Sequence, residues 1–460
     1  MLHLPDAFRD RMKAQLGAEY ADFEAALEQT APVSIRLNPK KPATVGFLAD
    51  RSAHELVPWC PEGIYLPLRP VFTLDPLFQA GAYYVQEASS MLLAEALRQS
   101  VKLHRPLNVL DLCAAPGGKS TLLASLLSPE SVLVSNEVIR TRVPVLRENL
   151  EKWGYPNVLI SNHDPEDFAA LRGFFDVVVV DAPCSGEGLF RKEPEATQEW
   201  SADSVALCAA RQQRILAAAA PLVEEGGFLL YSTCTYNETE NLTNVAWLHE
   251  QGFESRRLHL PPDWGVVEVS EKTAYGYQCY PHRVQGEGFF ISVLQKTKPG
   301  WFSMKNPPRA FKSMKPLRSR ETAQLRAFFA EPDSFSYWEK PNAELIAVPR
   351  ALEKNLQLLD SALRQKGFGI DVGTFKGSDL IPAHALALST AVSSSLPGVE
   401  LPKEDALRYF KKENVVLDTE VRGWVLARYE GLNLGWMKGV GNRVNNYLPK
   451  DWRIRMEIRE

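Results

Sequence analysis

The sequence lacks the marks of several common protein classes. Its six cysteines, at positions 60, 113, 184, 208, 234 and 279, include no Cys-x-x-Cys pair, which argues against a zinc ribbon and against a secreted disulfide framework. No apolar run is long enough to span a bilayer. The start of the chain has acidic residues and no long apolar stretch, unlike a secretory signal. We therefore expect a cytoplasmic protein with no membrane partner and no bound metal.

A large net charge is also missing, but the charge that is present is unevenly spread. The whole chain sums to −4. Residues 1–300 hold 27 Lys and Arg against 37 Asp and Glu, which gives −10, whereas residues 301–460 hold 25 against 19, which gives +6. A basic region of this kind suggests contact with a polyanion. A merely solvated surface is the alternative, because the excess is mild.

The chain before residue 101 gives mixed local signals. The spacing of apolar residues predicts helices over 1–28 and 83–97. Alternation over 33–41 predicts a strand, and the proline-rich text from 58 to 76 predicts loops. Because 460 residues exceed what one hydrophobic core usually serves, we expect two or three domains.

From Pro106 onward, short apolar runs alternate with helical segments. Near-continuous apolar strands that alternate with helices indicate a parallel sheet covered on both faces, so we predict an α/β doubly wound fold. Its ligands should lie at the carboxyl ends of the strands. The predicted strands are 107–113, 131–137, 157–162, 176–182, 226–233 and 288–295, with helices near 118–127, 140–153 and 205–220.

The end of the chain has a composition of its own. Residues 301–320 carry six Lys and Arg, three prolines and no acid, which predicts a basic linker over 301–330. A third domain is then expected over 331–460. Its last part, 434–456, mixes glycine with Arg, Lys, Trp and Tyr side chains.

The turn Asp111–Ser120 (DLCAAPGGKS) follows one predicted strand and opens a predicted helix. Pro116, Gly117 and Gly118 allow a tight turn and a close approach of the backbone to a ligand. The turn has neither the GxGxxG pattern of dinucleotide enzymes nor a GK[ST] phosphate-binding pattern with its leading glycine. It therefore favours a ligand without a pyrophosphate.

Acidic residues follow the next two predicted strands. Glu137 ends the second strand, where a carboxylate can accept hydrogen bonds from ribose hydroxyls. Asp164 follows the third strand and could bind an adenine amine. An anionic rim also repels phosphates and attracts a sulfonium cation. Each acid taken alone is better explained as a solvated strand-end residue, but acids on successive strands favour S-adenosylmethionine as the cofactor.

Two cysteines, Cys184 and Cys234, follow the fourth and fifth predicted strands, which commonly lie side by side in a doubly wound sheet. A single thiol in such a place is more often packed than reactive; two are harder to dismiss. Thiolate addition to carbon 6 of a cytosine would make carbon 5 able to attack a sulfonium methyl group. Asp181 could bind the cytosine amine and ring nitrogen, and Lys119 adds positive potential that lowers a thiol pKa.

The motifs DLCAAPGGKS, DAPCSGEGLFRKEP, STCTYNETEN and PHRVQGEGFFISVL together resemble the Nol–Nop–Sun (NSUN) RNA cytosine-carbon-5 methyltransferases, and among them the bacterial RsmF type that modifies small-subunit ribosomal RNA. The match spans about the first two thirds of the chain. The resemblance implies a class I (Rossmann-like) methyltransferase domain over 101–300. It also implies an α+β RNA-binding domain over 1–100, and RNA-binding domains over 331–460 that end in a PUA-like module.

The resemblance also implies roles for individual residues. Cys234 is the implied nucleophile and Cys184 the group that assists product release, while Asp181 contacts base and cofactor beside Lys119. The text after Cys234 departs from the more usual proline-containing sequence. The implied cofactor-binding residues are Cys113, Ala114, Ala115, Pro116, Gly117, Gly118, Lys119, Glu137, Arg142, Asp164 and Asp181.

The implied partner is ribosomal RNA or the small ribosomal subunit. For the oligomeric state, a monomer is the default expectation. Trp436, Tyr447 and Trp452 could stack on bases, although core packing is the better explanation for Trp452. Three other functions remain open: a tRNA cytosine-carbon-5 methyltransferase, a methyltransferase for protein or small molecules, and a non-catalytic RNA-binding or ribosome-assembly factor. The paired thiols disfavour the second, and retention of Asp181 and Lys119 beside them disfavours the third.

Overall fold

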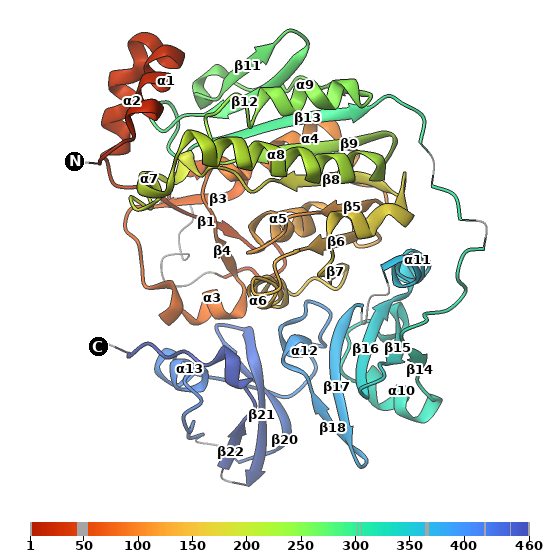
Figure 1. Ribbon diagram of the computed structural model, residues 1–460. Helices are drawn as coiled ribbons and strands as arrows, with labels where there is room; N and C mark the ends of the chain where they lie inside the picture. Colours follow the sequence, from red (N-terminus) through yellow and green to blue (C-terminus); the bar gives the residue numbers. More distant parts are fainter. Residues whose placement is uncertain are drawn as a thin grey trace.

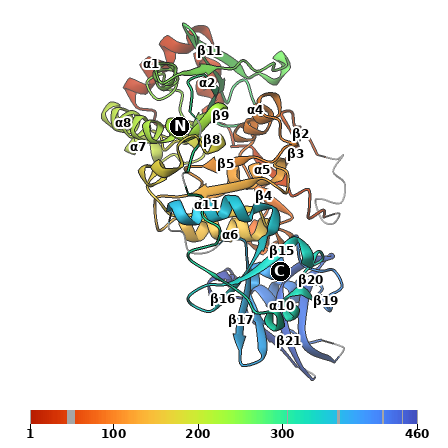
Figure 2. The ribbon, with the colours of Figure 1, turned by 90° about the vertical axis from the view of Figure 1, so that its right-hand side faces the viewer.

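The computed structural model describes residues 2–43, 54–300, 302–304, 306–363, 368–417, 420–441 and 443–458. The described strands form four sheets (Figure 1). The largest has nine strands, and the two C-terminal sheets lie together on one side of it (Figures 1 and 2). Within these ranges, no helix combines the length and the apolar character needed to cross a bilayer.

The N-terminal region consists of a helix pair and a four-stranded sheet. The helices expected over 1–28 are confirmed, as is the strand expected to start at Val33. The sheet has the order β2-β3-β1-β4. The elements are α1 (Asp6–Leu16), the 3-10 helix η1 (Gly17–Glu19), α2 (Tyr20–Leu27), β1 (Val33–Leu37), β2 (Leu56–Val57), β3 (Cys60–Leu66) and β4 (Tyr83–Val85).

Two local predictions in this region are wrong. The helix expected over 83–97 begins instead with β4, which pairs with β1, and the loop expected over 58–76 contains β3. In both places side chains such as Tyr83 and Ile64 are buried in the sheet, and this packing overrides local spacing and prolines. The helical segments that follow are η4 (Phe72–Leu74), α3 (Pro76–Ala80), η5 (Ser89–Met91) and α4 (Leu92–Ser100).

The central sheet contains the six strands predicted after Pro106. Its order is β11-β12-β13-β9-β8-β5-β6-β7, and β10 pairs with β13. Neighbours from β7 to β9 are parallel, whereas β13 joins β9 antiparallel. The strands are β5 (Asn108–Asp111), β6 (Val132–Asn136), β7 (Val158–Ser161), β8 (Phe175–Asp181), β9 (Val223–Thr233), β10 (Phe253–Ser255), β11 (Val267–Glu271), β12 (Ala274–Cys279) and β13 (Phe289–Lys296).

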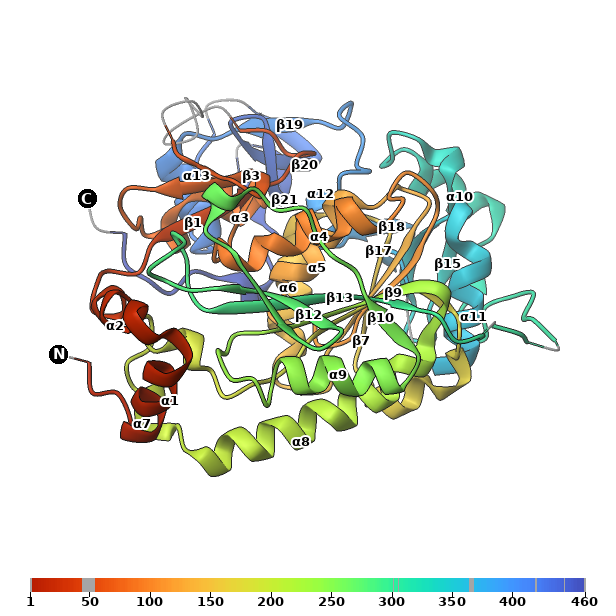
Figure 3. The same ribbon diagram turned by 90° about the horizontal axis from the view of Figure 1, so that it is seen from above.

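Helices cover both faces of the parallel strands, which confirms the doubly wound fold (Figure 3). Along β8, Val178 and Val180 pack with α8 and α9, whereas Val177 and Val179 pack with α4 and α5. The strand order reverses beside β5, and ligands of open α/β sheets bind at such a point. The helices are α5 (Gly118–Leu126), α6 (Val143–Trp153), η6 (Pro165–Leu171), η7 (Glu187–Leu189), α7 (Ala196–Glu199), α8 (Ala202–Ala219), η8 (Ala220–Leu222), α9 (Leu242–Glu250) and η9 (Pro262–Trp264).

The C-terminal region contains two antiparallel-rich sheets. The third sheet has the order β14-β15-β16-β17-β18 and the fourth β19-β20-β21-β22. Asn355 on α11 donates a hydrogen bond to Asn108 Oδ1 at 2.7 Å, which ties this region to β5. The elements are β14 (Lys315–Pro316), α10 (Ser319–Arg326), η10 (Pro332–Ser334), β15 (Phe335–Glu339), β16 (Glu344–Pro349), η11 (Arg350–Leu352), α11 (Glu353–Leu363), β17 (Ile370–Lys376), β18 (Asp379–Pro382), α12 (His384–Leu388), β19 (Gly398–Glu400), α13 (Lys403–Phe410), β20 (Val421–Tyr429), β21 (Leu432–Gly441), β22 (Arg443–Asn446) and η12 (Lys450–Trp452).

The linker expected over 301–330 differs from the structure in its second half. Strand β14 pairs with β15, and Leu325 of α10 is buried in the core of the third sheet. The basic side chains suggested a solvated segment, but the apolar residues between them pack inward. Residues 301 and 305 of the expected linker lie outside the described residues.

Candidate active site

The two loops that carry the predicted thiols meet at one end of the central sheet. Strands β8 and β9 are parallel neighbours with Asp181 opposite Ser232. The loops that follow them therefore leave the sheet side by side. The Sγ atoms of Cys184 and Cys234 lie 2.9 Å apart, and the backbone N–H of Cys234 donates to Cys184 Sγ at 3.3 Å. The two thiols expected to lie side by side are thus adjacent.

The two thiols differ in their surroundings. The hydrogen bond with Cys234 raises the pKa of Cys184 well above its ordinary value, and burial and the carboxylate of Glu240 act in the same direction. Cys184 is therefore protonated at neutral pH and can donate to the sulfur of Cys234.

A cation lies beside the thiols. Lys119, the second residue of α5, donates to Asp181 Oδ2 at 2.7 Å. The other oxygen of Asp181 accepts from Ser232 Oγ at 2.8 Å. Burial alone would lower the pKa of Lys119, but Asp181, Asp111 and Cys234 together raise it. The ammonium group therefore stays charged within electrostatic range of the Cys234 sulfur.

The predicted cofactor loop, residues 113–119, runs from just after β5 into the first turn of α5 and is held from the side of β6. Glu137 is buried and accepts from the N–H groups of Ala115 at 3.3 Å and Ile139 at 2.8 Å. Arg142 Nη2 donates to the Ala115 carbonyl at 2.7 Å, and Arg142 Nη1 lies 3.5 Å from Glu137 Oε2. At Gly117 the backbone φ is 115°, which a residue with a side chain rarely adopts. Glu137 and Arg142 thus fix the shape of this loop.

The side chain of Asp164 does not contact Glu137 or Arg142 but bonds to η6 and α8. Its Oδ1 caps η6 by accepting from the N–H of Glu166 at 3.1 Å, and it forms an ion pair with Arg214 at 3.4 Å. The loop that contains it nevertheless adjoins the end of β6, because Asn162 Nδ2 donates to the Glu137 carbonyl at 2.5 Å. Its contact with a cofactor stays a prediction.

Sequence reasoning missed Asp111, although it is the first residue of the quoted turn. Its side chain is fully buried and accepts from Ser120 Oγ at 2.6 Å, while its Oδ1 has no hydrogen-bond partner among the described residues. Burial raises the pKa of Asp111 to about 7. A buried acid at the end of a strand, next to a glycine turn, was the available signal.

Glu240 is a second residue that the sequence did not single out. It is fully buried and accepts from the Ser185 N–H at 2.9 Å, from Ser185 Oγ at 2.5 Å and from Gln212 Nε2 at 2.9 Å. It therefore ties the Cys184 loop to the segment that follows Cys234. Burial raises the pKa of Glu240 above its ordinary value.

The residues around the cofactor loop fit S-adenosylmethionine. Asp111 has a buried oxygen with no hydrogen-bond partner among the described residues, which suits a positive group, and Glu137 lies at the end of β6, where a ribose is expected. Val138 and Ile139 are 46% and 48% exposed beside it, and apolar side chains in that position suit the flat face of an adenine ring. This donor set can hold a cation, a ribose and a base at one strand end.

Three family models match successive parts of the chain. A model described as 16S rRNA methyltransferase RsmB/F matches residues 99–295. A model for the N-terminal domain of 16S rRNA methyltransferase RsmF matches residues 4–88, and one for the methyltransferase RsmF PUA domain matches residues 397–454. In the order given, these spans correspond to the central sheet, the N-terminal region and the fourth sheet.

Relatives of known name and known structure agree with these models. The chain is 31% identical to ribosomal RNA small subunit methyltransferase F of Klebsiella pneumoniae, over 98% of this chain and 96% of the relative. It is 28% identical to a methyltransferase homologue from Pyrococcus horikoshii, with a TM-score of 0.54 over 64% of this chain and 96% of that one. NSun6 from the same organism, crystallised with SFG, shares the fold with a TM-score of 0.54 at 21% identity, over 64% and 98% of the two chains. The chain therefore belongs to the RsmB/F family of 16S rRNA methyltransferases.

Proposed function

We propose that this protein transfers a methyl group from S-adenosylmethionine to carbon 5 of a cytosine in 16S ribosomal RNA, through a covalent bond between Cys234 and the base. One observation carries the proposal. Two thiols lie 2.9 Å apart beside the Lys119–Asp181 ion pair, at the strand ends next to the cofactor loop. Methylation of an amine or hydroxyl would need no such pair of sulfurs.

The Cys234 sulfur begins the reaction as the nucleophile. As a thiolate it forms a bond to carbon 6 of the cytosine, and the displaced electron pair makes carbon 5 nucleophilic. The charged Lys119 stabilises the thiolate before attack. The free lone pairs of Asp181 accept a hydrogen bond from the exocyclic amine and so fix the ring. A cytosine that is paired in a helix must first be flipped out, at a cost of roughly a few kcal/mol.

The cofactor loop positions the methyl donor. The residues that would hold it are the 113–119 turn, Glu137 at the ribose and Asp111 at a positive group. When bound, S-adenosylmethionine supplies a methyl group on a positively charged sulfur. Arg142 contributes by holding the Ala115 carbonyl in place, and the exposed side chains of Val138 and Ile139, beside Glu137, would pack on the adenine ring.

Cys184 completes the cycle at the release step. After methylation, the bond between the Cys234 sulfur and carbon 6 must break and the proton on carbon 5 must leave. The protonated Cys184 gives its proton to the departing Cys234 sulfur, 2.9 Å away. The resulting Cys184 thiolate takes the proton from carbon 5. Cys184 is then a thiol again, and Cys234 holds one proton more than the thiolate that attacked. Cys234 loses this proton to solvent before the next cycle, so each methyl transfer releases one proton.

The choice of ribosomal RNA rests on the relatives and on the C-terminal region. The named relatives act on small-subunit ribosomal RNA, as their names state.

The prediction that Trp436 stacks on RNA bases is wrong. Its side chain is only 1% exposed and donates a hydrogen bond to the Ala383 carbonyl, so Trp436 is a core residue. Trp452 packs on His384 at 4.4 Å between ring centres, as expected, and Tyr447 is the exposed aromatic. We further propose that the enzyme acts as a cytoplasmic monomer.

The proposal is tested with purified protein, S-adenosylmethionine and three substrates: naked 16S ribosomal RNA, assembled small subunits and bulk tRNA. Mass spectrometry of the digested nucleosides should show 5-methylcytidine in one of the first two. Formation in tRNA alone would favour the tRNA methyltransferase that the sequence left open. No 5-methylcytidine in any substrate would contradict the proposed reaction.

A further inference from the structure

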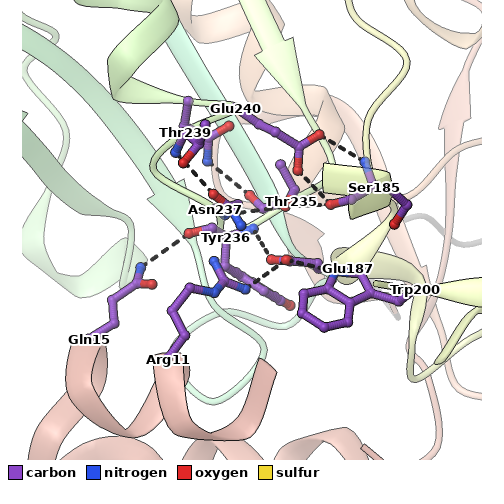
Figure 4. A network of polar contacts seen from close by, with 12 residues as sticks. Arg11, Gln15, Ser185, Glu187, Trp200, Thr235, Tyr236, Asn237, Thr239 and Glu240 are labelled. Carbon is purple, nitrogen blue, oxygen red and sulfur yellow. Dashed lines mark hydrogen bonds and ion pairs between the residues drawn. The ribbon is translucent and has the colours of Figure 1, made fainter. Parts of the chain in front are cut away.

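Helix α1 contacts both thiol-bearing loops through polar side chains (Figure 4). Arg11 Nη2 lies 2.7 Å from Oε1 of Glu187, in the loop after β8. One turn further along, Gln15 Nε2 donates to the Tyr236 carbonyl at 3.3 Å, in the loop after β9. The N-terminal helix thus reaches the segments that follow Cys184 and Cys234.

Glu187 connects these two segments to each other. Its side chain is fully buried, three residues after Cys184. Its Oε2 accepts from the backbone N–H of Tyr236 at 3.1 Å, two residues after Cys234. The neighbouring Gly188 N–H donates to the Cys234 carbonyl at 2.8 Å. The Glu187 carboxylate therefore sits where the backbones of the two thiol loops are joined.

The charge of Glu187 needs a partner. Its Oε1 accepts from Trp200 Nε1 at 3.0 Å, but Arg11 is the cation within ion-pair distance among the described residues. A buried carboxylate that loses its cation is strongly unfavourable, so the loop around it would move toward solvent. Such a movement would shift Gly188 and the Cys234 backbone with it.

The helix pair itself is docked by apolar contacts. Phe8 lies edge-on to Phe190 with ring centres 5.0 Å apart, and Phe23 lies edge-on to Tyr236 at 5.2 Å. These rings belong to one buried cluster with α1 and α2. Loss of the Arg11 charge therefore leaves the helices attached.

We infer that Arg11 is a positioning residue. Through its ion pair with Glu187 it keeps the Cys184 and Cys234 loops at the relative positions that the reaction requires, so that the N-terminal helices complete the active site. The inference rests on the proposed covalent reaction. A misplacement of about 1 Å at a reacting atom can cost on the order of 100-fold in rate. We therefore expect Arg11→Ala to slow methyl transfer about 10- to 100-fold with unchanged affinity for S-adenosylmethionine.

The experiment compares Arg11→Ala with a matched control, Arg9→Ala. Arg9 lies on the same helix and its ion pairs, with Asp6 and Glu24, stay within the N-terminal helices. Single-turnover methyl transfer, cofactor affinity and melting temperature are measured for each variant. In a Cys184→Ala background, the rate at which the covalent RNA adduct appears is measured as well.

Two further variants make the result specific. Arg11→Lys keeps a cation and should recover most of the rate. Glu187→Gln removes the buried charge, so the Arg11→Ala/Glu187→Gln double variant should be faster than Arg11→Ala alone. A positioning role is supported if this rescue appears and Arg9→Ala stays within about twofold of the wild type.

Other outcomes overturn the inference. Arg11→Ala with a rate like that of Arg9→Ala would remove the positioning role, and so would a double variant no faster than Arg11→Ala. Loss of rate that only mirrors loss of folded protein would do the same. If no adduct forms even with Arg11 intact, the covalent mechanism is wrong, but the methyl-transfer rates still decide the role of Arg11.

Discussion

Charged side chains are used differently around the two thiol loops, which follow β8 and β9, and in the fourth sheet. Around the thiol loops, cations and acids from distant segments face each other in the interior. Arg191 and Glu287, for example, pair at 3.0 Å with side chains that are 4% and 5% exposed. In the fourth sheet, Arg422 on β20 and Arg443 on β22 are exposed and flank Val440, which is itself 61% exposed.

The buried and the exposed charges serve two different tasks, the positioning of loops and the attraction of RNA. Buried ion pairs fix the positions of loops to which reacting atoms are attached, and removing one partner leaves an uncompensated charge. Exposed arginines on neighbouring strands add attraction for a polyanion without fixing any reacting atom. Substitutions around the thiol loops should therefore change the rate of methyl transfer, whereas substitutions in the fourth sheet should change the affinity for RNA and its salt dependence.

The largest effect is expected at Cys234. Replacement by alanine removes the proposed nucleophile, so both turnover and any covalent RNA adduct should vanish while RNA affinity is kept. Turnover is measured by transfer of labelled methyl groups and the adduct by denaturing gel electrophoresis. Cys208→Ala, on α8 and only partly buried, is the control. Residual turnover in Cys234→Ala would reassign the nucleophile.

Cys184→Ala should have the next largest effect, and its effect on the covalent adduct should be the opposite of that of Cys234→Ala. Without the protonated thiol, the bond to Cys234 still forms but breaks slowly, so the covalent RNA adduct should accumulate as turnover falls. The same gel assay measures the adduct against time. An inactive variant without adduct would show that the release role is wrong.

The buried carboxyl group of Asp111, at the end of β5, should make the stability of the fold depend on pH. The pKa of Asp111 is about 7 in the folded protein against an ordinary 3.8, so between these values the native state holds a proton that the unfolded chain has lost. This stability is complete below the unfolded pKa and is lost as pH rises through about 7. Asp111→Asn should flatten that decline by on the order of 1 kcal/mol per pH unit. Denaturant unfolding from pH 4.5 to 7.5 measures it, and equal slopes in both proteins would contradict it.

The smallest effect is expected in the fourth sheet. Arg422→Ala/Arg443→Ala should weaken binding of 16S ribosomal RNA several-fold and lower the salt dependence of the affinity by about one unit of log–log slope per lost phosphate contact. The single-turnover rate at saturating RNA should not change. Arg408→Ala is the control, because Arg408 pairs with Glu404 at 2.7 Å. A changed single-turnover rate at saturating RNA would contradict the view that the fourth sheet contributes to RNA affinity alone.

Much of the catalytic region could be predicted from sequence because its signals are local. The run Val177–Val180 is apolar throughout, as a strand buried on both faces must be, and the thiols follow such strands directly. The region around Tyr83 failed for the opposite reason. Its spacing suits a helix, but pairing with β1 across 46 residues of chain, from Leu37 to Tyr83, gives it a strand conformation.

The sequence by itself determined the succession of strands and helices along the chain after Pro106, the glycine turn after the first of these strands and the presence of two thiols at strand ends. Only the tertiary structure decided that Arg11 meets Glu187, that one Asp111 oxygen finds no hydrogen-bond partner in the described part of the chain, and that Trp436 is a core residue. Periodicity records which face of an element is buried, since burial repeats along the chain. Pairing between charges far apart in sequence leaves no such repeat, because it depends on how separately formed elements pack.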